Sequence, residues 1–219
     1  MNVMRKETNK YFLSVEGETE KWYFDWLQRM INAETTARYT VKFDCPVQKN
    51  PLKRAKGLPI LGKTEITHIM DRESEDVAHT RQFETTLNRM RDAEGLGKRI
   101  KYRLGYTNFT FELWIVLHKT ECSGHLTHRR QYLSLINSAF SEQFENLDQY
   151  KHETNFKRIL SKLSLDDVRN ATSRAKAITQ ANYEKGFVLH QHKRYSYYKE
   201  NPSLSIWEFV ESVMLDSFA

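Results

Sequence analysis

Along the first half of the chain, segments with the hydrophobic pattern of a strand alternate with segments that have the hydrophobic period of a helix. Short apolar or alternating runs typical of strands recur, with polar turns between them. These runs cover residues 11–15, 39–45, 66–70 and 100–106. Apolar residues at helical spacing occupy residues 22–31 and 77–90. The order strand, helix, strand, strand, helix, strand predicts an α/β fold with a mostly parallel central sheet flanked by helices.

The second half of the chain follows the helical period almost throughout. Helices are expected at residues 132–140, 156–163, 168–178 and 205–214. The last of them has a clear start signal, because Ser205 and Glu208 have the spacing of a capping box. We divide the chain into an α/β core, residues 1–120, and a helical C-terminal region, residues 121–219, packed on that core as one compact unit. Between the two patterns, residues 111–118 form an apolar run that suits a helix or a strand.

Acidic residues follow two of the buried strand-like runs. Glu16 comes after the first run, and Asp71 and Glu73 come after the third. The carboxyl ends of neighbouring parallel strands meet in one crevice, where carboxylates repel each other unless a cation joins them. Glu20 lies one helical turn beyond Glu16 and is an auxiliary ligand candidate. Mg²⁺ prefers such oxygen ligands, so the pattern predicts a magnesium site; solvated turn residues or charges at a helix N-terminus are the simpler explanation.

Composition narrows the class of protein. The chain has 219 residues, of which 39% are hydrophobic and 12% aromatic, enough to build a core, so it is globular rather than disordered. Its net charge of +6 favours polyanions, although only modestly. The two cysteines lie far apart in sequence and predict no disulfide framework. Without a signal-like N-terminus or a long apolar run, we expect a cytoplasmic protein with no membrane contact.

Two basic segments are candidate nucleic-acid contacts. Residues 46–64 contain no acidic residue and are rich in Pro and Gly, which predicts an irregular, mobile loop. Its basic residues are Lys49, Lys53, Arg54, Lys56 and Lys63. Cations on such a loop suit a phosphate backbone, although a solubilising loop has the same composition. Lys193 and Arg194 lie beside several tyrosines, which suits base stacking or, equally, a half-buried connection.

Two further lysines lie in the helical region, Lys151 and Lys176. Either is placed to stabilise negative charge in a transition state. The apolar faces of their helices are clear, however, and this favours an ordinary solvated helix face for both.

Four segments resemble, in order, the motifs of the RloB-like family (the AbiL second-component group), which belongs to the Toprim-like nucleases. They are FLSVEGETEKWYF at residues 12–24, IMDRES at residues 69–74, TNFTFELWIVLHK at residues 107–119 and NPSLSIWEFVESV at residues 201–213. The glutamate-glycine motif alone is short and weak. Four motifs in order, with family-like spacing, are much more specific.

The resemblance implies particular site residues. Toprim folds hold Mg²⁺ (or Mn²⁺) on a glutamate after the first strand and on an Asp-x-Asp pair after a later one. The matching positions here are Glu16, Asp71 and Glu73, so the pair is Asp-x-Glu, whose second side chain reaches one methylene further. The family also retains a glutamate and a histidine in its third motif. They correspond to Glu112 and His118, which become catalytic candidates, although a histidine on an apolar face is more often a satisfied core residue.

The resemblance also implies a function. It predicts a Mg²⁺-dependent Toprim-like endonuclease that cleaves phosphodiester bonds of RNA, such as tRNA, or of DNA in prokaryotic anti-phage defence. Relatives are commonly encoded beside an ABC-type or OLD-like ATPase, which we expect to control the nuclease. A homo-oligomer is compatible with the sequence. The competing hypothesis is a non-catalytic sensor or adaptor that binds nucleic acid and reports to the ATPase. The family's usual proline in the third motif is replaced by Phe109.

Overall fold

The computed structural model describes residues 6–60, 62–122, 124 and 126–218. The N-terminal half contains β1 (Thr8–Ser14), α1 (Glu18–Ala33), β2 (Thr40–Asp44), α2 (Pro51–Gly57), β3 (Thr64–Arg72), α3 (Val77–Glu94), β4 (Ile100–Asn108) and α4 (Glu112–Leu117). The C-terminal half contains a 3₁₀ turn η1 (Arg129–Gln131), α5 (Tyr132–Phe140), α6 (Leu147–Lys151), α7 (Glu153–Ser161), α8 (Leu165–Glu184), β5 (Leu189–His192), β6 (Tyr195–Tyr198) and α9 (Ile206–Phe218). None of these helices combines the length and apolar character that a membrane crossing needs.

The predicted α/β fold is confirmed. Within the described residues, the central sheet has four parallel strands in the order β2-β1-β3-β4. In the register, Ser14 of β1 lies opposite His68 of β3, and Arg72 of β3 lies opposite Asn108 of β4. The carboxyl ends of β1, β3 and β4 therefore reach the same edge of the sheet, which is where the acidic motifs stand.

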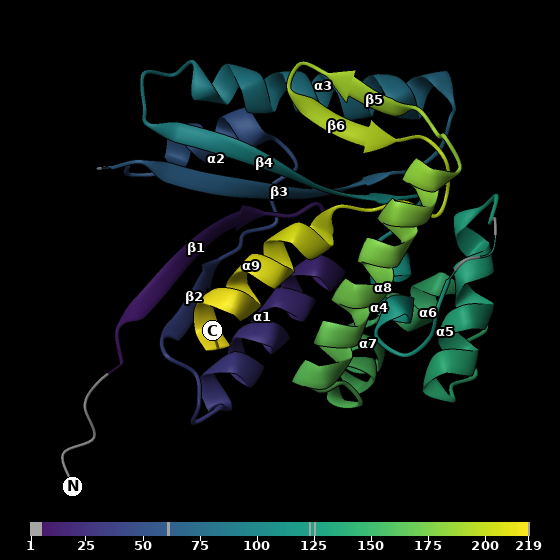
Figure 1. The fold of residues 1–219 in the computed structure, drawn as a ribbon. Helices are drawn as coiled ribbons and strands as arrows, with labels where there is room; N and C mark the ends of the chain where they lie inside the picture. Colours follow the sequence, from purple (N-terminus) through teal and green to yellow (C-terminus); the bar gives the residue numbers. More distant parts are fainter. Residues whose placement is uncertain (1–5, 61, 123, 125, 219) are drawn as a thin grey trace, which may run out of the picture.

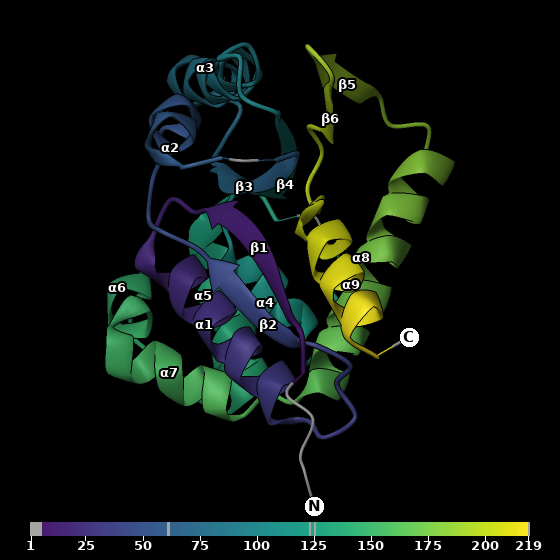
Figure 2. The same ribbon diagram turned by 90° about the vertical axis from the view of Figure 1, so that its left-hand side faces the viewer.

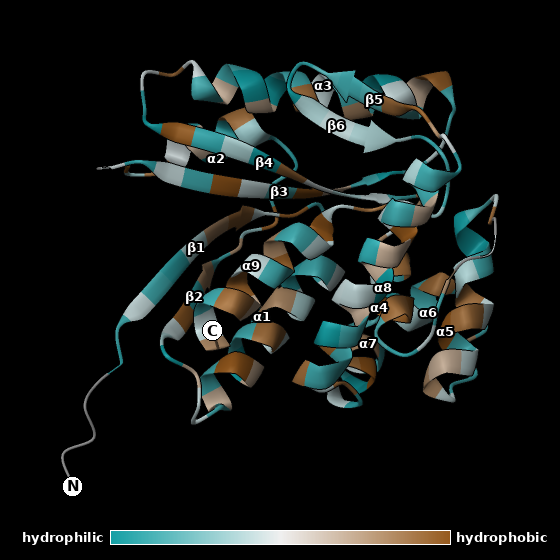
Figure 3. Ribbon diagram, viewed as in Figure 1, coloured by the Kyte–Doolittle hydropathy of each residue, from teal (hydrophilic) through white to brown (hydrophobic). Residues whose placement is uncertain are grey.

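Helices cover both faces of this sheet (Figures 1 and 2). α2 and α3 pack on one face, where Ile66 and Met70 of β3 join Phe83 and Leu87 of α3 in an apolar cluster. α1, α4, α8 and α9 lie on the other face and share a larger cluster that also includes α5 and α7. Figure 3 shows hydrophobic residues along the strands and on inward helix faces. The large cluster joins the two halves of the chain into one core around Trp114, which is fully buried.

The prediction of an irregular, mobile loop for residues 46–64 was wrong. Residues 51–57 form helix α2, and Pro51 is its first residue. A proline has no backbone N–H, but the first N–H groups of a helix have no partner within the helix, so proline is tolerated at this position. The side chain of Asn50 caps this helix by accepting from the backbone N–H of Lys53 at 3.1 Å. The Lys98 ammonium donates to the carbonyls of Ala55 at 3.0 Å and Leu58 at 2.8 Å, so both ends of α2 are held.

The C-terminal half also differs from its all-helical pattern. β5 and β6 form an antiparallel hairpin whose turn contains Lys193 at φ +57°. Tyr197 is buried, and its ring lies 4.9 Å from that of Phe83 on α3. The hairpin therefore packs on the α3 side of the molecule. Residues 111–118, left open between helix and strand, contain the short helix α4.

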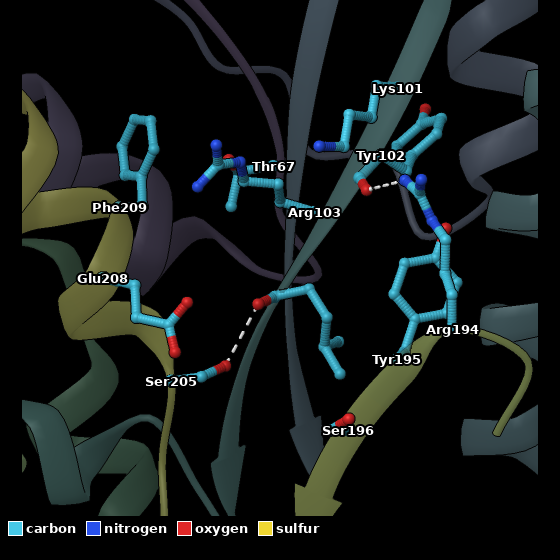
Figure 4. Close-up of a pocket in the computed structure, with 11 residues that line it drawn as sticks. Thr67, Lys101, Tyr102, Arg103, Arg194, Tyr195, Ser196, Ser205, Glu208 and Phe209 are labelled. Carbon is cyan, nitrogen blue, oxygen red and sulfur yellow. Dashed lines mark hydrogen bonds between the residues drawn. The ribbon is translucent and has the colours of Figure 1, made fainter. Parts of the chain in front are cut away.

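Side chains cover the outer edge of β4, where the sheet ends. Arg194 donates to the carbonyl of Tyr102 at 2.5 Å, and Glu94 accepts from the Tyr102 N–H at 2.7 Å. The Ser205 hydroxyl donates to the carbonyl of Leu104 at 3.0 Å. Figure 4 shows Arg194 and Ser205 approaching the strand from opposite sides of a groove. These contacts satisfy backbone groups that a further strand would otherwise use.

Candidate active site

Four carboxylates gather at the carboxyl ends of β1 and β3. Glu16 follows β1, Asp71 lies near the end of β3, Glu20 is in the first turn of α1, and Glu112 begins α4. We call these four side chains the acidic cluster. Glu20 and Glu112 are buried, whereas Glu16 and Asp71 are partly exposed. Glu16 and Asp71 thus form the more exposed side of the cluster, which we call its mouth.

Burial and mutual repulsion disfavour the ionised forms of Glu16 and Asp71. Burial, and then repulsion from Glu20, raises the pKa of Glu16 to about 7, although Lys49 and the backbone N–H of Asp71 act in the opposite direction. This shift disfavours the ionised form of Glu16 by roughly 3 kcal/mol. Burial and the charge of Glu20 likewise raise the pKa of Asp71 well above its ordinary value, against a 2.6 Å hydrogen bond donated by Thr107.

The backbone at Gly17 explains why a glycine follows Glu16. A Cβ at position 17 would lie 2.8 Å from Oε2 of Glu20. The φ of Gly17 is −145°, which any residue adopts, so the requirement is the close approach of the carboxylate and not an unusual conformation. The Thr19 hydroxyl donates to the same oxygen at 3.0 Å. Gly17 thus lets Glu20 fold back against the start of its own helix toward the cluster.

The cation facing the cluster comes from the C-terminal half. Lys151, at the end of α6, places its Nζ 3.1 Å from Oε1 of Glu112, while Thr110 donates to Oε2 of the same carboxylate. Burial alone lowers the pKa of Lys151, but attraction to Glu112 and Asp71 outweighs it, so the net pKa is raised. Lys176, the other candidate, pairs with Glu211 instead. The sequence analysis named both lysines but favoured a solvated helix face for each, because no helical period reveals which acid a lysine meets.

Tyr150 brings a second polar group to the same place. Its side chain is fully buried, and its hydroxyl has no hydrogen-bond partner among the described residues. Burial and then the charges of Glu112 and Glu20 raise its pKa well above the usual value. An unpaired buried hydroxyl costs free energy.

A tight turn positions Glu112. Asn108 donates its side-chain N–H groups to three carbonyls at and just after the end of β6, including that of Glu200 at 2.6 Å. Phe109 has φ +64°, and its N–H donates to the carbonyl of Arg72 at 2.8 Å. A proline ring, restricted to φ near about −65°, does not fit this conformation. The replacement of proline at position 109 therefore accompanies a different turn, which is held by hydrogen bonds.

Two sequence-predicted residues lie outside the acidic cluster. Glu73 turns to the rim, 3.5 Å from Nε2 of His79 and 3.7 Å from Nη1 of Arg129, although its charge is still near enough to raise the pKa of Glu16. His118 lies in the core at 1% exposure, with Nε2 3.1 Å from the Tyr23 hydroxyl and Nδ1 2.8 Å from the Trp114 carbonyl. Both ring nitrogens are thus occupied within the fold, as in a structural histidine.

The predicted nucleic-acid contacts also divide into residues that are paired within the fold and residues that are exposed. Arg54 pairs with Asp44 at 2.6 Å and also donates to the Leu13 carbonyl, and Arg194 pairs with Glu94. These two arginines therefore stabilise the fold. The remaining lysines are exposed: Lys49, Lys53, Lys56, Lys63 and Lys193. Lys49 is near enough to the acidic cluster to lower the pKa of Glu16.

The donor chemistry of the cluster fits a hard divalent cation. Among the residues that the structure describes, no group of three or more His, Cys, Asp or Glu side chains is arranged so that it could hold a metal ion. Mg²⁺, however, needs only one or two carboxylates, with water and phosphate completing its shell. Burial first, and then repulsion from neighbouring carboxylates, raises the pKa values of Glu16, Glu20 and Asp71. A divalent cation would relieve this repulsion.

Comparison with known proteins identifies the family to which the chain is similar. The family model described as RloB-like protein matches residues 11–213. A search of curated proteins and a search of solved structures each found no match. The matched span contains the whole acidic cluster together with Lys151, so it covers both the sheet and the helices that complete the site.

Proposed function

The chain belongs to the RloB-like family, and from this premise we propose that it is a Mg²⁺- or Mn²⁺-dependent Toprim-like nuclease. Its substrate would be the phosphodiester bond of RNA, such as tRNA, or of DNA. One observation carries the proposal: Glu16, Glu20, Asp71 and Glu112 converge at the carboxyl edge of the sheet with their charge only partly compensated. A role in anti-phage defence, under the control of an ABC-type or OLD-like ATPase, follows from the family resemblance.

The residues divide into two groups by what they would do. Glu16 and Asp71, at the mouth of the cluster, would hold the cation, with Glu20 behind them. When bound, the cation supplies Lewis acidity toward a phosphoryl oxygen and lowers the pKa of a bound water. Glu112 holds the Lys151 ammonium at the edge of the site. Lys151 is then placed to stabilise negative charge on the phosphate, and Thr107 orients Asp71 through its hydrogen bond.

Cleavage assays test the proposal. Purified protein is incubated with a tRNA pool, other RNA and plasmid DNA, in Mg²⁺ or Mn²⁺ and in EDTA, with and without the ABC-type or OLD-like ATPase that we expect to be its partner. We expect metal-dependent cleavage that is lost in the near-isosteric Glu16→Gln, Asp71→Asn double variant. Glu208→Gln is the matched control, because Glu208 is another carboxylate whose pKa is raised by burial but lies on α9. Full cleavage by the double variant would refute the metal assignment.

A second function is favoured by one observation, the ion pair between Lys151 and Glu112. An internal ammonium already neutralises part of the cluster, as it would in a non-catalytic adaptor that binds nucleic acid and reports to the ATPase. Calorimetric titration separates the two functions. Binding of Mg²⁺ or Mn²⁺ that disappears in the double variant supports the nuclease, and the absence of heat at millimolar metal supports the adaptor.

A further inference from the structure

A cleft of about 520 Å³ opens beside the acidic cluster, between η1, α5 and α6. Lys151 lines this cleft and also pairs with Glu112 inside the cluster. Arg129, on the same cleft, lies 3.7 Å from Glu73 at the rim. The cleft and the cluster therefore share a border formed by these two cations, and a ligand lying in the cleft would be adjacent to the carboxylates.

One wall of the cleft is cationic and preorganised. Arg129 and Arg130 are exposed side chains of the short turn η1. A capping box fixes this turn: His128 Nδ1 accepts from the Arg130 N–H at 3.1 Å, and Gln131 accepts from the His128 N–H at 2.9 Å. With Lys151, the wall presents three cations, and guanidinium groups bind phosphate oxygens through paired hydrogen bonds.

The rest of the lining has a different chemistry. Glu145 and Asp148 add carboxylates, and Leu133 and Leu147 add apolar surface. A phosphate backbone running through the whole cleft would meet those carboxylates and be repelled. A base, by contrast, offers exocyclic amino groups that donate to carboxylates and a flat face that packs on apolar side chains. The cleft thus matches a phosphate on one side and a base on the other.

We propose that this cleft binds one unpaired nucleotide next to the bond that is cut, and that the substrate is single-stranded or locally unpaired nucleic acid. In a duplex, both flat faces of each base are stacked on neighbouring bases, so a paired base cannot pack a face on Leu133 and Leu147 while its amino group reaches Glu145 or Asp148. Only the placement of the nucleotide next to a cleaved bond rests on the proposed nuclease function. The binding itself does not require catalysis.

Binding in EDTA tests the cleft independently of cleavage. Fluorescence anisotropy is measured with labelled RNA and DNA strands of about twelve nucleotides, each alone and as a duplex. We expect wild-type protein to bind the single strands about tenfold more tightly than the duplexes, because only unpaired bases fill the cleft. Arg129→Ala, Arg130→Ala should lose at least about tenfold in affinity for single strands. The control, Arg81→Ala, Arg89→Ala, removes the same charge from exposed positions on α3 and should lose much less.

A third variant reports on the base. Glu145→Gln, Asp148→Asn should reduce the preference for strands rich in cytosine and adenine over strands of uracil, because it replaces the acceptors for their amino groups. Equal affinity for single strands and duplexes, equal losses in the two arginine variants, or an unchanged base preference would each overturn the proposal. These results are separable from the nuclease assay. Strand-selective binding without any metal-dependent cleavage refutes only the nuclease function, and cleavage that ignores the cleft variants refutes only the cleft.

Discussion

Replacing Lys151 by methionine tests whether the ammonium holds the acidic cluster together. Methionine keeps the length and apolar stem of the side chain but removes the charge that lies 3.1 Å from Glu112. Glu112 has no exposed surface, so its carboxylate stays where it is without its cation. Glu20 and Asp71 then repel it with less compensation. We expect the Lys151→Met protein to fold with reduced stability in EDTA.

The exposure of Lys151 determines how much stability the Lys151→Met variant should lose. Removing one partner of a fully buried ion pair costs about 3–5 kcal/mol. The Lys151 side chain is 37% exposed, so solvent screens part of the interaction and about 2 kcal/mol is the better expectation. For a chain of this length, that loss corresponds to a fall of roughly 4–8 °C in Tm. Millimolar Mg²⁺ should restore much of it, since a divalent cation replaces the missing charge.

Urea unfolding of a double-mutant cycle measures the effect. The cycle compares wild type, Lys151→Met, Glu112→Gln and the double variant, first in EDTA and then in Mg²⁺. In EDTA, the double variant should be no less stable than Lys151→Met alone, which gives a coupling of about 1–2 kcal/mol. Lys176→Met is the matched control, because Lys176 also pairs with a glutamate but on the surface, and it should cost under about 1 kcal/mol.

Two results would refute this reasoning. If Lys151→Met unfolds at the same urea concentration as wild type, the ammonium does not stabilise the cluster. If the two single variants are strictly additive, Lys151 and Glu112 do not interact, and the charge of the cluster is balanced in another way.

Three further predictions concern the surroundings of the site. Gly17→Ala should displace the Glu20 carboxylate, which lowers cleavage and reduces stability by about 1 kcal/mol. Gly57→Ala is the control, because a Cβ at position 57 meets nothing within 4 Å and should change neither property. Equal effects of the two variants in parallel cleavage and urea assays would contradict this. His118→Gln should retain cleavage once folded while losing about 1–2 kcal/mol of stability, and a folded but inactive variant would restore the histidine to catalysis. Burial lowers the pKa of His118 to about 4, so the unfolded chain takes up a proton below pH 6.5 that the folded chain refuses. The stability advantage of wild type over His118→Gln should therefore shrink by about 1.4 kcal/mol per pH unit below pH 6.5 and change sign before pH 4. A constant gap would rule this out.

The sequence reveals the sheet because each strand is a local pattern. Residues 66–70 and 100–106 are recognisable as strands without any knowledge of their neighbours, and the βαβ order then implies the parallel arrangement. The acids after β1 and β3 were predictable for the same reason, since parallel strands end at one edge. Helix α2 was missed because its cap at Asn50 and the Lys98 ammonium outweigh a composition rich in Pro and Gly.

The features that the sequence did not reveal depend on contacts between residues far apart in the chain. Lys151 meets Glu112 because α6 packs on the core, and no local period encodes that meeting. His118 lies on an apolar face, and only the structure shows that Tyr23 and the Trp114 carbonyl occupy both of its nitrogens. The hairpin of β5 and β6 was missed because its tyrosines are buried by packing on α3, which a sequence window cannot contain.

The covered edge of β4 has a consequence for synthesis on the ribosome. The strand is complete at residue 108, but Arg194 and Ser205, which occupy its outer backbone groups, are made almost a hundred residues later. During that interval the strand presents an open edge to any neighbouring chain. A product cut short before residue 194 would contain all four strands of the parallel sheet and lack both of these blocking side chains. Truncated forms of this protein are therefore expected to aggregate through β4, although the full-length chain does not expose it.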